Sequence, residues 1–316
     1  MNISSKTVAI LGRGVWGSTL GKIAQNNQHE VRFWSYRGDI SLDWVIRDAP
    51  IVVSAVSMKG VVSTANKLRS LNLPSDKIVV TATKGLDPET THTPSQIWQK
   101  IFPANPIVVL SGPNLAKEIA QGLPAATVLA SKNLAAAKIV RGIFASDTFR
   151  VYINEDPIGT ELGGTLKNVM AIASGVCDGM NLGTNAKAAL LTRALPEITR
   201  VGTHLGASGE TFYGLSGLGD LIATCDSPLS RNYQVGYGLA QGKNLNQILS
   251  DLEGTAEGVN TTNVLIRIAD LEAIAVPIAR QVHRLLRGVI TPTQAIQALM
   301  ERDLKPEFGN LDLYGF

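Results

Sequence analysis

The chain has 316 residues, of which 45% are hydrophobic and 17% charged, so it can bury a large core and does not have the composition of a disordered chain. Its formal net charge is +3 without long basic runs, which argues against nucleic acid or a membrane surface as a partner. The only cysteines, Cys177 and Cys225, and the four histidines follow no metal or disulfide spacing, so we expect a reducing compartment and no metal.

The N-terminal segment leads directly into an apolar, strand-like run. Residues 1–6 lack the long apolar core and the small-residue cleavage site of a signal peptide. No apolar run approaches the roughly 18 residues of a membrane-spanning helix. These features predict a soluble, cytoplasmic protein.

Seven short apolar runs alternate with helix-like stretches in the first half of the chain. They lie at residues 7–11, 31–34, 51–56, 77–82, 107–110, 126–130 and 149–153. Strands that are apolar on both faces and separated by helices are typical of a mostly parallel sheet covered on both sides. We therefore predict an α/β domain over residues 1–156.

The residue composition changes after Pro157, where alanine-, leucine- and glycine-rich segments with helical spacing replace the valine-rich runs. This pattern predicts an all-helical domain over residues 157–316. One connection in the first domain is unusually short, because only residues 35–50 separate the second and third strands. That length allows a single short helix, which we place near residues 43–47.

The first strand is followed at once by GRGVWG at residues 12–17, which opens a helix-like segment. In this context the spacing fits a dinucleotide fingerprint. Gly12 makes the tight turn, Gly14 admits the pyrophosphate, and Gly17 lets the helix pack on the strand.

The end of the second strand bears on the choice of cofactor. NAD-specific folds usually place an acid there, but residues 34–39 read WSYRGD, with no acid at the tip. Arg37 and Ser35 could meet a 2′-phosphate, so we expect NADP(H) to be accepted. In the alternative, Asp39 folds back and binds the ribose of NAD(H).

Two further strand ends carry polar residues. Lys84 follows a buried strand, at the carboxyl edge where open α/β sheets bind ligands, although a lysine there can also be an ordinary solvated loop residue. Residues 111–116, SGPNLA, form a similar junction. They start a helix whose amide groups could face a bound anion.

Lys167 is the only charged residue between Glu161 and Asp178. On a helix, Gly163 and Gly164 would share its face and leave room for a ligand. Because a buried ammonium group is unfavourable unless it is paired, this pattern suggests a functional lysine. The alternative is a lysine that snorkels to the surface.

Two motifs follow in the helical half. Residues 214–221, GLSGLGDL, place the carboxylate of Asp220 in a glycine-rich turn. Ser230 is a natural N-cap for a helix that begins with Arg231 and Asn232. Such a helix start would make a phosphate receptor, although an ordinary capped surface helix has the same pattern.

Taken together, six motifs resemble NAD(P)-dependent glycerol-3-phosphate dehydrogenase of the bacterial type. They occur in that family's order, at residues 12–17, 82–86, 111–113, 162–168, 217–221 and 230–232. The resemblance implies a Rossmann-type domain joined to a helical domain, with the site between them. It also implies reversible reduction of dihydroxyacetone phosphate to sn-glycerol 3-phosphate for glycerophospholipid synthesis, with NAD(H) or NADP(H), and a possible homodimer.

The resemblance implies roles for individual residues. Lys167 matches the proton acceptor for alcohol oxidation. We assign Asp220, the second catalytic residue, to orienting Lys167 or a substrate hydroxyl and not to proton transfer. The implied substrate-binding residues are Lys84, Gly112, Asn114, Lys167, Asp220, Ser230, Arg231 and Asn232. The implied cofactor-binding residues are Gly12, Gly14, Val15, Trp16, Gly17, Arg37, Lys84, Ala116, Arg231 and Glu257.

The chain departs from the family pattern at three places. Val15 and Asn114 stand where hydroxyl residues are common, and the connection after Arg37 is short.

For the chemistry we expect the ammonium form of Lys167 to protonate the developing alkoxide during ketone reduction. Burial and Lys84 would lower its pKa, whereas Asp220 would raise it. Two alternatives remain open. One is a related dehydrogenase of 3-hydroxy acids or a ketopantoate-type reductase, and the other is a module that senses NAD(P)H without turnover.

Overall fold

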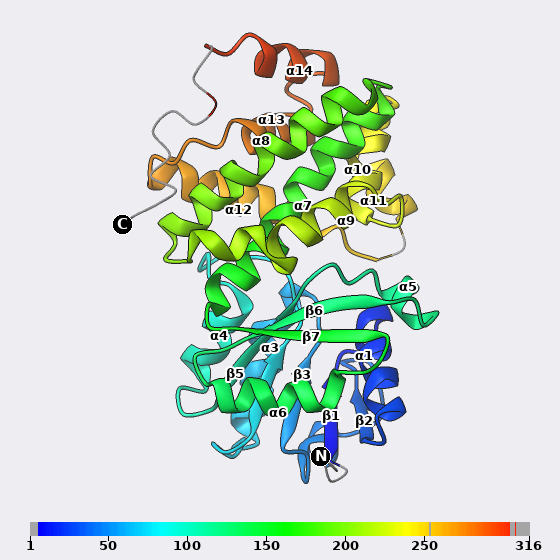
Figure 1. Ribbon diagram of the computed structural model, residues 1–316, viewed down its shortest axis with the longest axis vertical. Helices are drawn as coiled ribbons and strands as arrows, with labels where there is room; N and C mark the ends of the chain where they lie inside the picture. The colour runs from blue at the N-terminus through cyan, green and yellow to red at the C-terminus, as the bar shows by residue number, and fades with distance from the viewer. Residues whose placement is uncertain (1–5, 253, 304–306, 308–316) are drawn as a thin grey trace.

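Seven strands form one sheet in the order β2-β1-β3-β4-β5-β6-β7 (Figure 1). The computed structural model describes residues 6–252, 254–303 and 307. The strands are β1 (Thr7–Leu11), β2 (Glu30–Trp34), β3 (Ile51–Ser54), β4 (Ile78–Thr81), β5 (Ile107–Ser111), β6 (Ala125–Ala130) and β7 (Phe149–Asn154). All seven were expected from the sequence. Residues 1–5, on which the signal-peptide expectation rests in part, lie outside the described residues.

Pairing in this sheet is parallel from β2 through β5, antiparallel between β5 and β6, and parallel again between β6 and β7. The prediction of a mostly parallel sheet is therefore confirmed. Strands β3, β4 and β5 are buried along their whole length, which explains why they are apolar on both faces. Because β1, β3, β4 and β5 are mutually parallel, the segments that follow them meet at one edge of the sheet.

Helices cover both faces of the sheet. One face packs against α1 (Val15–Asn26) and α6 (Leu134–Phe144), and the other against α2 (Leu42–Ile46), α3 (Met58–Ser70) and α4 (Pro94–Ile101). The short α5 (Ala116–Ala120) contacts α1. Helix α2 lies in the short connection, as predicted, and is capped by Ser41, whose hydroxyl accepts a bond from the amide of Trp44.

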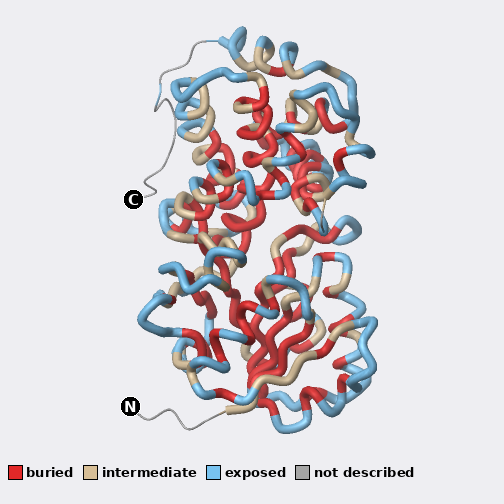
Figure 2. The backbone as a smooth tube through the Cα atoms, turned by 90° about the vertical axis from the view of Figure 1, so that its right-hand side faces the viewer, coloured by how far each residue is buried: buried red, intermediate tan, exposed pale blue. Residues whose placement is uncertain are grey.

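The described residues after Asp156 are mostly helical, as predicted, whereas residues 253, 304–306 and 308–316 of the predicted helical domain lie outside the described residues. The elements of this half are α7 (Pro157–Gly179), α8 (Gly183–His204), η1 (Gly209–Tyr213), η2 (Leu215–Gly219), α9 (Asp220–Cys225), α10 (Arg231–Ala240), α11 (Leu245–Asp251), α12 (Glu257–Leu271), α13 (Pro277–Leu286) and α14 (Pro292–Met300). Helix α7 contacts α8, α9, α10, α12 and α13, and Figure 2 shows the buried chain running through the middle of this half. A helix that is apolar nearly all round is buried on all sides, which explains this central position.

The same helix joins the two halves. Helix α7 begins next to the sheet, contacts β5 and β6, and then runs up through the helical half (Figure 1). Its first turns therefore lie between the domains, and the residues on them can meet the carboxyl edge of the sheet. Within the described part of the chain, no helix is long and apolar enough to cross a membrane.

Candidate active site

Lys167 lies on α7 and is only 6% exposed, so the snorkelling alternative is wrong. Its Nζ atom lies 3.0 Å from Oδ1 of Asp220 and donates a hydrogen bond to Oγ1 of Thr224. Both partners are on α9, which packs against α7. The cost of burying the ammonium group is thus offset by a carboxylate and a hydroxyl in direct contact.

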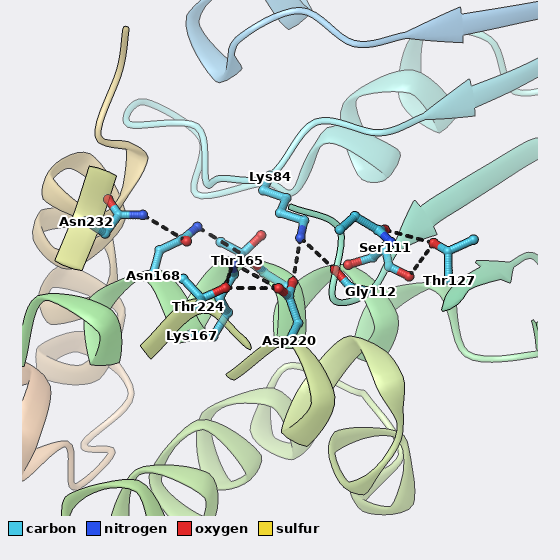
Figure 3. Close-up of polar contacts among 12 residues, drawn as sticks. Lys84, Ser111, Gly112, Thr127, Thr165, Lys167, Asn168, Asp220, Thr224 and Asn232 are labelled. Carbon is cyan, nitrogen blue, oxygen red and sulfur yellow. Dashed lines mark hydrogen bonds and ion pairs between the residues drawn. The ribbon is translucent and has the colours of Figure 1, made fainter. Parts of the chain in front are cut away.

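Asp220 is the centre of the cluster (Figure 3). It is 2% exposed, and its second oxygen, Oδ2, forms an ion pair with Lys84. Thr224, one helical turn later, donates to Oδ1 over 3.0 Å. The expectation that Asp220 sits in a turn is wrong, because it is the first residue of α9 and follows the single π-helical turn η2. Gly217 in η2 passes so close to Phe212 that a Cβ atom would lie 2.1 Å from the carbonyl oxygen of Phe212.

Lys84 reaches this cluster from the other domain. It follows β4 at the carboxyl edge of the sheet, and its Nζ atom also donates to the carbonyl oxygen of Gly112 over 3.2 Å. With an ion pair to a buried carboxylate, it is not the solvated loop lysine of the alternative interpretation. One carboxylate from the helical domain therefore joins a lysine of its own domain to a lysine of the sheet domain.

Gly163 and Gly164 have a different use from the one expected. A Cβ atom on Gly163 would lie 2.7 Å from the carbonyl oxygen of Ser216, and one on Gly164 would lie 2.3 Å from Oγ of Ser111. The space beside these glycines is therefore filled by η2 and by the end of β5. They allow α7 to approach both elements closely, and the expectation that they leave room for a ligand is wrong.

The charges in the cluster influence one another. Burial lowers the pKa of Lys167 to about 8, assisted by the charge of Lys84 and opposed by Asp220, in the directions that the sequence predicts. Burial alone would raise the pKa of Asp220, but the two lysines outweigh it and hold the pKa below its usual value. With both lysines protonated, the cluster carries one positive charge in excess. It can therefore stabilise a developing oxyanion.

The residues after β5 are held by β6. The side-chain amide of Asn114 donates to the carbonyl oxygen of Ala126 over 3.2 Å and accepts from Oγ1 of Thr127 over 2.9 Å. Gly112 has a φ of +156° and its absent Cβ would lie 3.1 Å from the same Ala126 oxygen, so a side chain there would be strained and crowded. This arrangement fixes the carbonyl group that receives Lys84.

The start of α10 contains the three residues that the sequence assigns to phosphate binding. Ser230 caps the helix, as predicted, since its Oγ accepts from the amide of Tyr233. Asn232 is buried and tied into the protein, because it donates to Oδ1 of Asn168 and accepts from the amide of Gly258, each over 2.9 Å. Arg231 is exposed, at the end of the helix where the dipole favours anions.

The glycine-rich turn after β1 fits a dinucleotide. Gly12 has a φ of +109°, and a Cβ on it would lie 2.6 Å from the carbonyl oxygen of Ala55, whereas one on Gly17 would lie 2.0 Å from that of Gly12. Gly14 differs, because a Cβ on it would meet no atom within 4 Å. Two glycines thus close the turn against β3 and α1, and the third leaves open space at the N-terminus of α1 where a pyrophosphate could lie.

Other residues assigned to the cofactor surround this turn. Val15 is 61% exposed at the start of α1, while Trp16 is partly buried beside the core under that helix. The carbonyl oxygen of Ala116 receives a bond from Thr19 of α1 over 3.4 Å. Arg37 is exposed just beyond β2, whose last carbonyl group accepts from the amide of Gly12 over 2.8 Å.

Glu257 lies apart from these residues in the sequence, at the first position of α12. Burial raises its pKa, while the amide of Met58, at the start of α3, and the charge of Arg231 act in the opposite direction. It therefore lies between the two domains, beside one of the residues assigned to phosphate binding.

Sequence reasoning missed two side chains in the site. Thr224 completes the contacts of Lys167 and Asp220, and the amide of Gly85 donates to Oγ1 of Thr165 over 3.1 Å. Thr224 lies four residues after Asp220, the spacing that puts two side chains on one helical face. Recognising that spacing required placing Asp220 in a helix instead of a turn.

A mostly parallel sheet with a glycine cradle, a helical domain and a lysine–aspartate cluster between them define a class of protein, the two-domain dehydrogenases that use a nicotinamide dinucleotide. Comparison with known families agrees with this class. Residues 7–43 and 38–137 match the family described as NAD-dependent glycerol-3-phosphate dehydrogenase N-terminus, and residues 156–297 match its C-terminus. The chain belongs to the NAD-dependent glycerol-3-phosphate dehydrogenase family.

Individual relatives agree along nearly the whole chain. A glycerol-3-phosphate dehydrogenase [NAD(P)+] of Acaryochloris marina is 64% identical over 98% of this chain and 100% of its own length. The Synechocystis protein of the same name is also 64% identical, over 97% of this chain and 96% of its own. The crystal structure of glycerol-3-phosphate dehydrogenase from Coxiella burnetii superposes with a TM-score of 0.90 at 33% identity, covering 94% and 99% of the two chains.

Proposed function

We propose that this protein catalyses the reversible NAD(P)H-dependent reduction of dihydroxyacetone phosphate to sn-glycerol 3-phosphate. The observation that carries the proposal is the buried cluster in which Asp220 joins Lys167 to Lys84. Such a cluster offers a proton and a positive charge to one oxygen atom of a ligand between the domains. The names of the full-length relatives supply the substrate.

In this proposal each residue has a defined task. Gly12, Gly14 and the start of α1 would hold the pyrophosphate of the dinucleotide, whose nicotinamide would supply the hydride. Lys167, as the ammonium form, donates its proton to the oxygen of the substrate carbonyl and takes it back in the reverse direction. Asp220 holds Lys167 toward that oxygen, and Lys84 adds a second cation beside it. Both lysines are then held in place before the substrate arrives, which is the basis of electrostatic catalysis.

The phosphate of the substrate is assigned to the start of α10. Arg231 supplies a guanidinium group there, and the helix dipole favours the same charge. Asn232 supports this position indirectly, because its amide ties α10 to Asn168, the neighbour of Lys167 on α7. Binding energy from the remote phosphate would then place the carbonyl carbon for reaction.

Both NADPH and NADH are proposed as cofactors, with Arg37 favouring NADPH. Arg37 is exposed and lies three residues beyond the end of β2, near which the adenosine ribose binds in such folds, and Asp39 two residues later is also exposed. A cytoplasmic location, a homodimer and a role in supplying glycerophospholipid backbones belong to the same proposal. They rest on the family and not on an observed contact.

One assay tests the proposal. Purified protein is mixed with dihydroxyacetone phosphate and either NADPH or NADH, and cofactor oxidation is followed by absorbance. We expect turnover with both cofactors and a lower KM for NADPH. A strong preference for NADH would contradict the role of Arg37. Turnover of ketopantoate but not of dihydroxyacetone phosphate would refute the proposed substrate.

A further inference from the structure

Helix α7 carries a second buried charged residue, Glu161, which has no part in the proton transfer described above. It is 2% exposed. Its two carboxylate oxygens accept from the backbone amide of Ser95 over 3.0 and 3.1 Å, and Oε2 also accepts from the hydroxyl of Ser95. A buried carboxylate is unfavourable unless it is well bonded, so its presence in an otherwise apolar stretch requires a reason.

These bonds cross from one domain to the other. Ser95 is the second residue of α4, on the sheet domain, whereas Glu161 belongs to the first turns of α7. The N-terminus of a helix favours a negative charge, so Glu161 stabilises the start of α4 through its dipole and its free amide. The helical domain thus supplies a capping group to a helix of the sheet domain.

Residues 85–95, which we call the docking segment, contact the helical domain at both ends. The amide of Gly85 donates to Thr165 of α7 over 3.1 Å, and Asn260 of α12 donates to the carbonyl oxygen of Leu86 over 3.0 Å. Leu86 is fully buried within the hydrophobic core of the helical domain. Glu161 holds the far end of this segment at Ser95.

Lys84 is the residue immediately before the docking segment. Thr165, which accepts the hydrogen bond from Gly85, lies four residues after Glu161 and therefore on the same face of α7. Lys167 follows Thr165 by two residues. The contacts that fix the docking segment on α7 therefore also fix Lys84 relative to Lys167. Both lysines must face one substrate oxygen, so the spacing between the two domains matters for the chemistry.

We propose that Glu161 is a positioning residue for the reduction of the substrate, because it fastens the docking segment to α7 and so aligns Lys84 with Lys167. This inference rests on the proposed function. Glu161 acts through Ser95 and the docking segment and does not itself touch the substrate. Its loss therefore affects the rate of the bound complex more than the binding of NADPH.

The chain offers a matched control. Glu197 on α8 is also 2% exposed and also caps a helix start, since its oxygens accept from the amides of Ile278 and Ala279 over 2.9 Å. Both of those amides belong to α13, inside the helical domain. Glu161→Gln and Glu197→Gln therefore each replace one acceptor oxygen of a buried cap by an NH2 group, but only the first cap lies between the domains.

The test compares kcat for dihydroxyacetone phosphate, the KM for NADPH and the melting temperature in wild type and both variants. We expect similar changes in the melting temperature in the two variants, because both carboxyl groups are equally buried. Glu161→Gln should reduce kcat about tenfold or more with little change in the KM for NADPH, whereas Glu197→Gln should keep kcat within about twofold of wild type. Ser95→Ala, which removes the hydroxyl contacts to Glu161 and Thr93 but keeps the amide bonds to Glu161, should reduce kcat by less.

Equal kcat values in wild type and Glu161→Gln would overturn the positioning role while leaving the proposed function intact. Absence of wild-type turnover would instead refute the proposed function. If Glu161→Gln does not fold, the test uses Ser95→Ala, Thr165→Val and the double variant. An unchanged kcat in Ser95→Ala, together with additive effects of the two substitutions in the double variant, would overturn the proposal. A reduced kcat in Ser95→Ala, together with non-additive effects of the two substitutions on kcat, would support it.

Discussion

At the scale of single residues, Lys167 shows how burial adjusts an ordinary side chain to a task. A lysine in water stays protonated far above neutral pH. Burial, with the charge of Lys84, lowers the pKa of Lys167 to about 8, and Asp220 prevents a larger change. An acid with a pKa near the working pH can both give and recover a proton, which a reversible reaction requires.

This pKa predicts the pH dependence of the reaction. Reduction of dihydroxyacetone phosphate needs the ammonium form of Lys167, so kcat/KM for reduction should fall as the pH rises above about 8. Oxidation of sn-glycerol 3-phosphate needs the neutral amine, so its kcat/KM should rise through the same range. Steady-state kinetics between pH 6.5 and 9.5 at constant ionic strength would measure both. Parallel profiles in the two directions would contradict the assignment.

Removing the amine should have a larger effect. Lys167→Ala should lower kcat by about 10²- to 10⁴-fold, the usual contribution of a general acid, and leave the Kd of NADPH, measured by fluorescence, nearly unchanged. Lys77→Ala is a suitable control. Lys77 is another buried lysine of the chain, at the opposite end of β4, where it donates to the carbonyl oxygens of Ile46 and Arg47. It should lose stability but not kcat.

At the scale of secondary-structure elements, two helices matter most for the site. Helix α7 carries Lys167, and α10 crosses it so closely that glycine is needed at the contact. A Cβ atom on Gly236 would lie 1.8 Å from the carbonyl oxygen of Ile172, and one on Gly175 would lie 2.0 Å from that of Tyr233. This close packing brings the start of α10, with Arg231, next to the helix that carries the proton donor.

The crossing of the two helices can be tested by adding one methyl group. Gly236→Ala should lower the free energy of unfolding by about 3 kcal/mol, the upper part of the usual range for overpacking, because the neighbouring atom is backbone and cannot move aside. Gly209→Ala is the control, since a Cβ atom on Gly209 would lie 3.6 Å from a methyl group of Thr203, an ordinary van der Waals contact. Urea unfolding of both variants gives the comparison, and equal stabilities would contradict the close contact.

The N-terminus of α10 is tested separately. Arg231→Ala should raise the KM for dihydroxyacetone phosphate by about tenfold or more, since a charge-assisted bond contributes roughly 1.5–3 kcal/mol, and should change kcat less. Arg280→Ala removes an exposed guanidinium paired with Asp270 and should leave both constants as they are. An unchanged KM in Arg231→Ala would place the phosphate elsewhere.

At the scale of the whole molecule, two buried glutamates make folding depend on pH. Burial raises the pKa of Glu161 and of Glu197 to about 7 from an ordinary 4.5. Between these pH values the folded chain holds protons that the unfolded chain has released. The free energy of unfolding should therefore fall by at most about 3 kcal/mol for each group as the pH rises from about 4.5 to 7. Above that pH it should level off.

A variant that cannot titrate tests this dependence. In Glu197→Gln, the difference in free energy of unfolding between pH 5 and pH 7.5 should be smaller than in wild type, because one of the two titrating groups is gone. Glu301→Gln, at an exposed position, should keep the wild-type difference. Chemical unfolding of each variant at the two pH values measures this difference in the free energy of unfolding. A variant with the full wild-type difference would show that Glu197 does not contribute.

The sequence by itself determined the elements and the family. Alternation of apolar runs with helical segments predicted all seven strands and the helical half, because burial on both faces leaves a local pattern. The motifs at residues 12–17, 162–168 and 217–221 identified the family, because close backbone contacts restrict the residue type at each position. Lys167 and Asp220 were both found in this way.

Only the tertiary structure decided how these residues meet. That Asp220 begins a helix, that Gly163 and Gly164 pack against other elements, and that Glu161 reaches Ser95 all depend on segments far apart in the chain. Such contacts leave no periodicity in the sequence, because each of these residues contacts a partner more than 50 positions away. The ionisation of the buried groups follows from the same cause, since the environment that sets each pKa exists only in the folded chain.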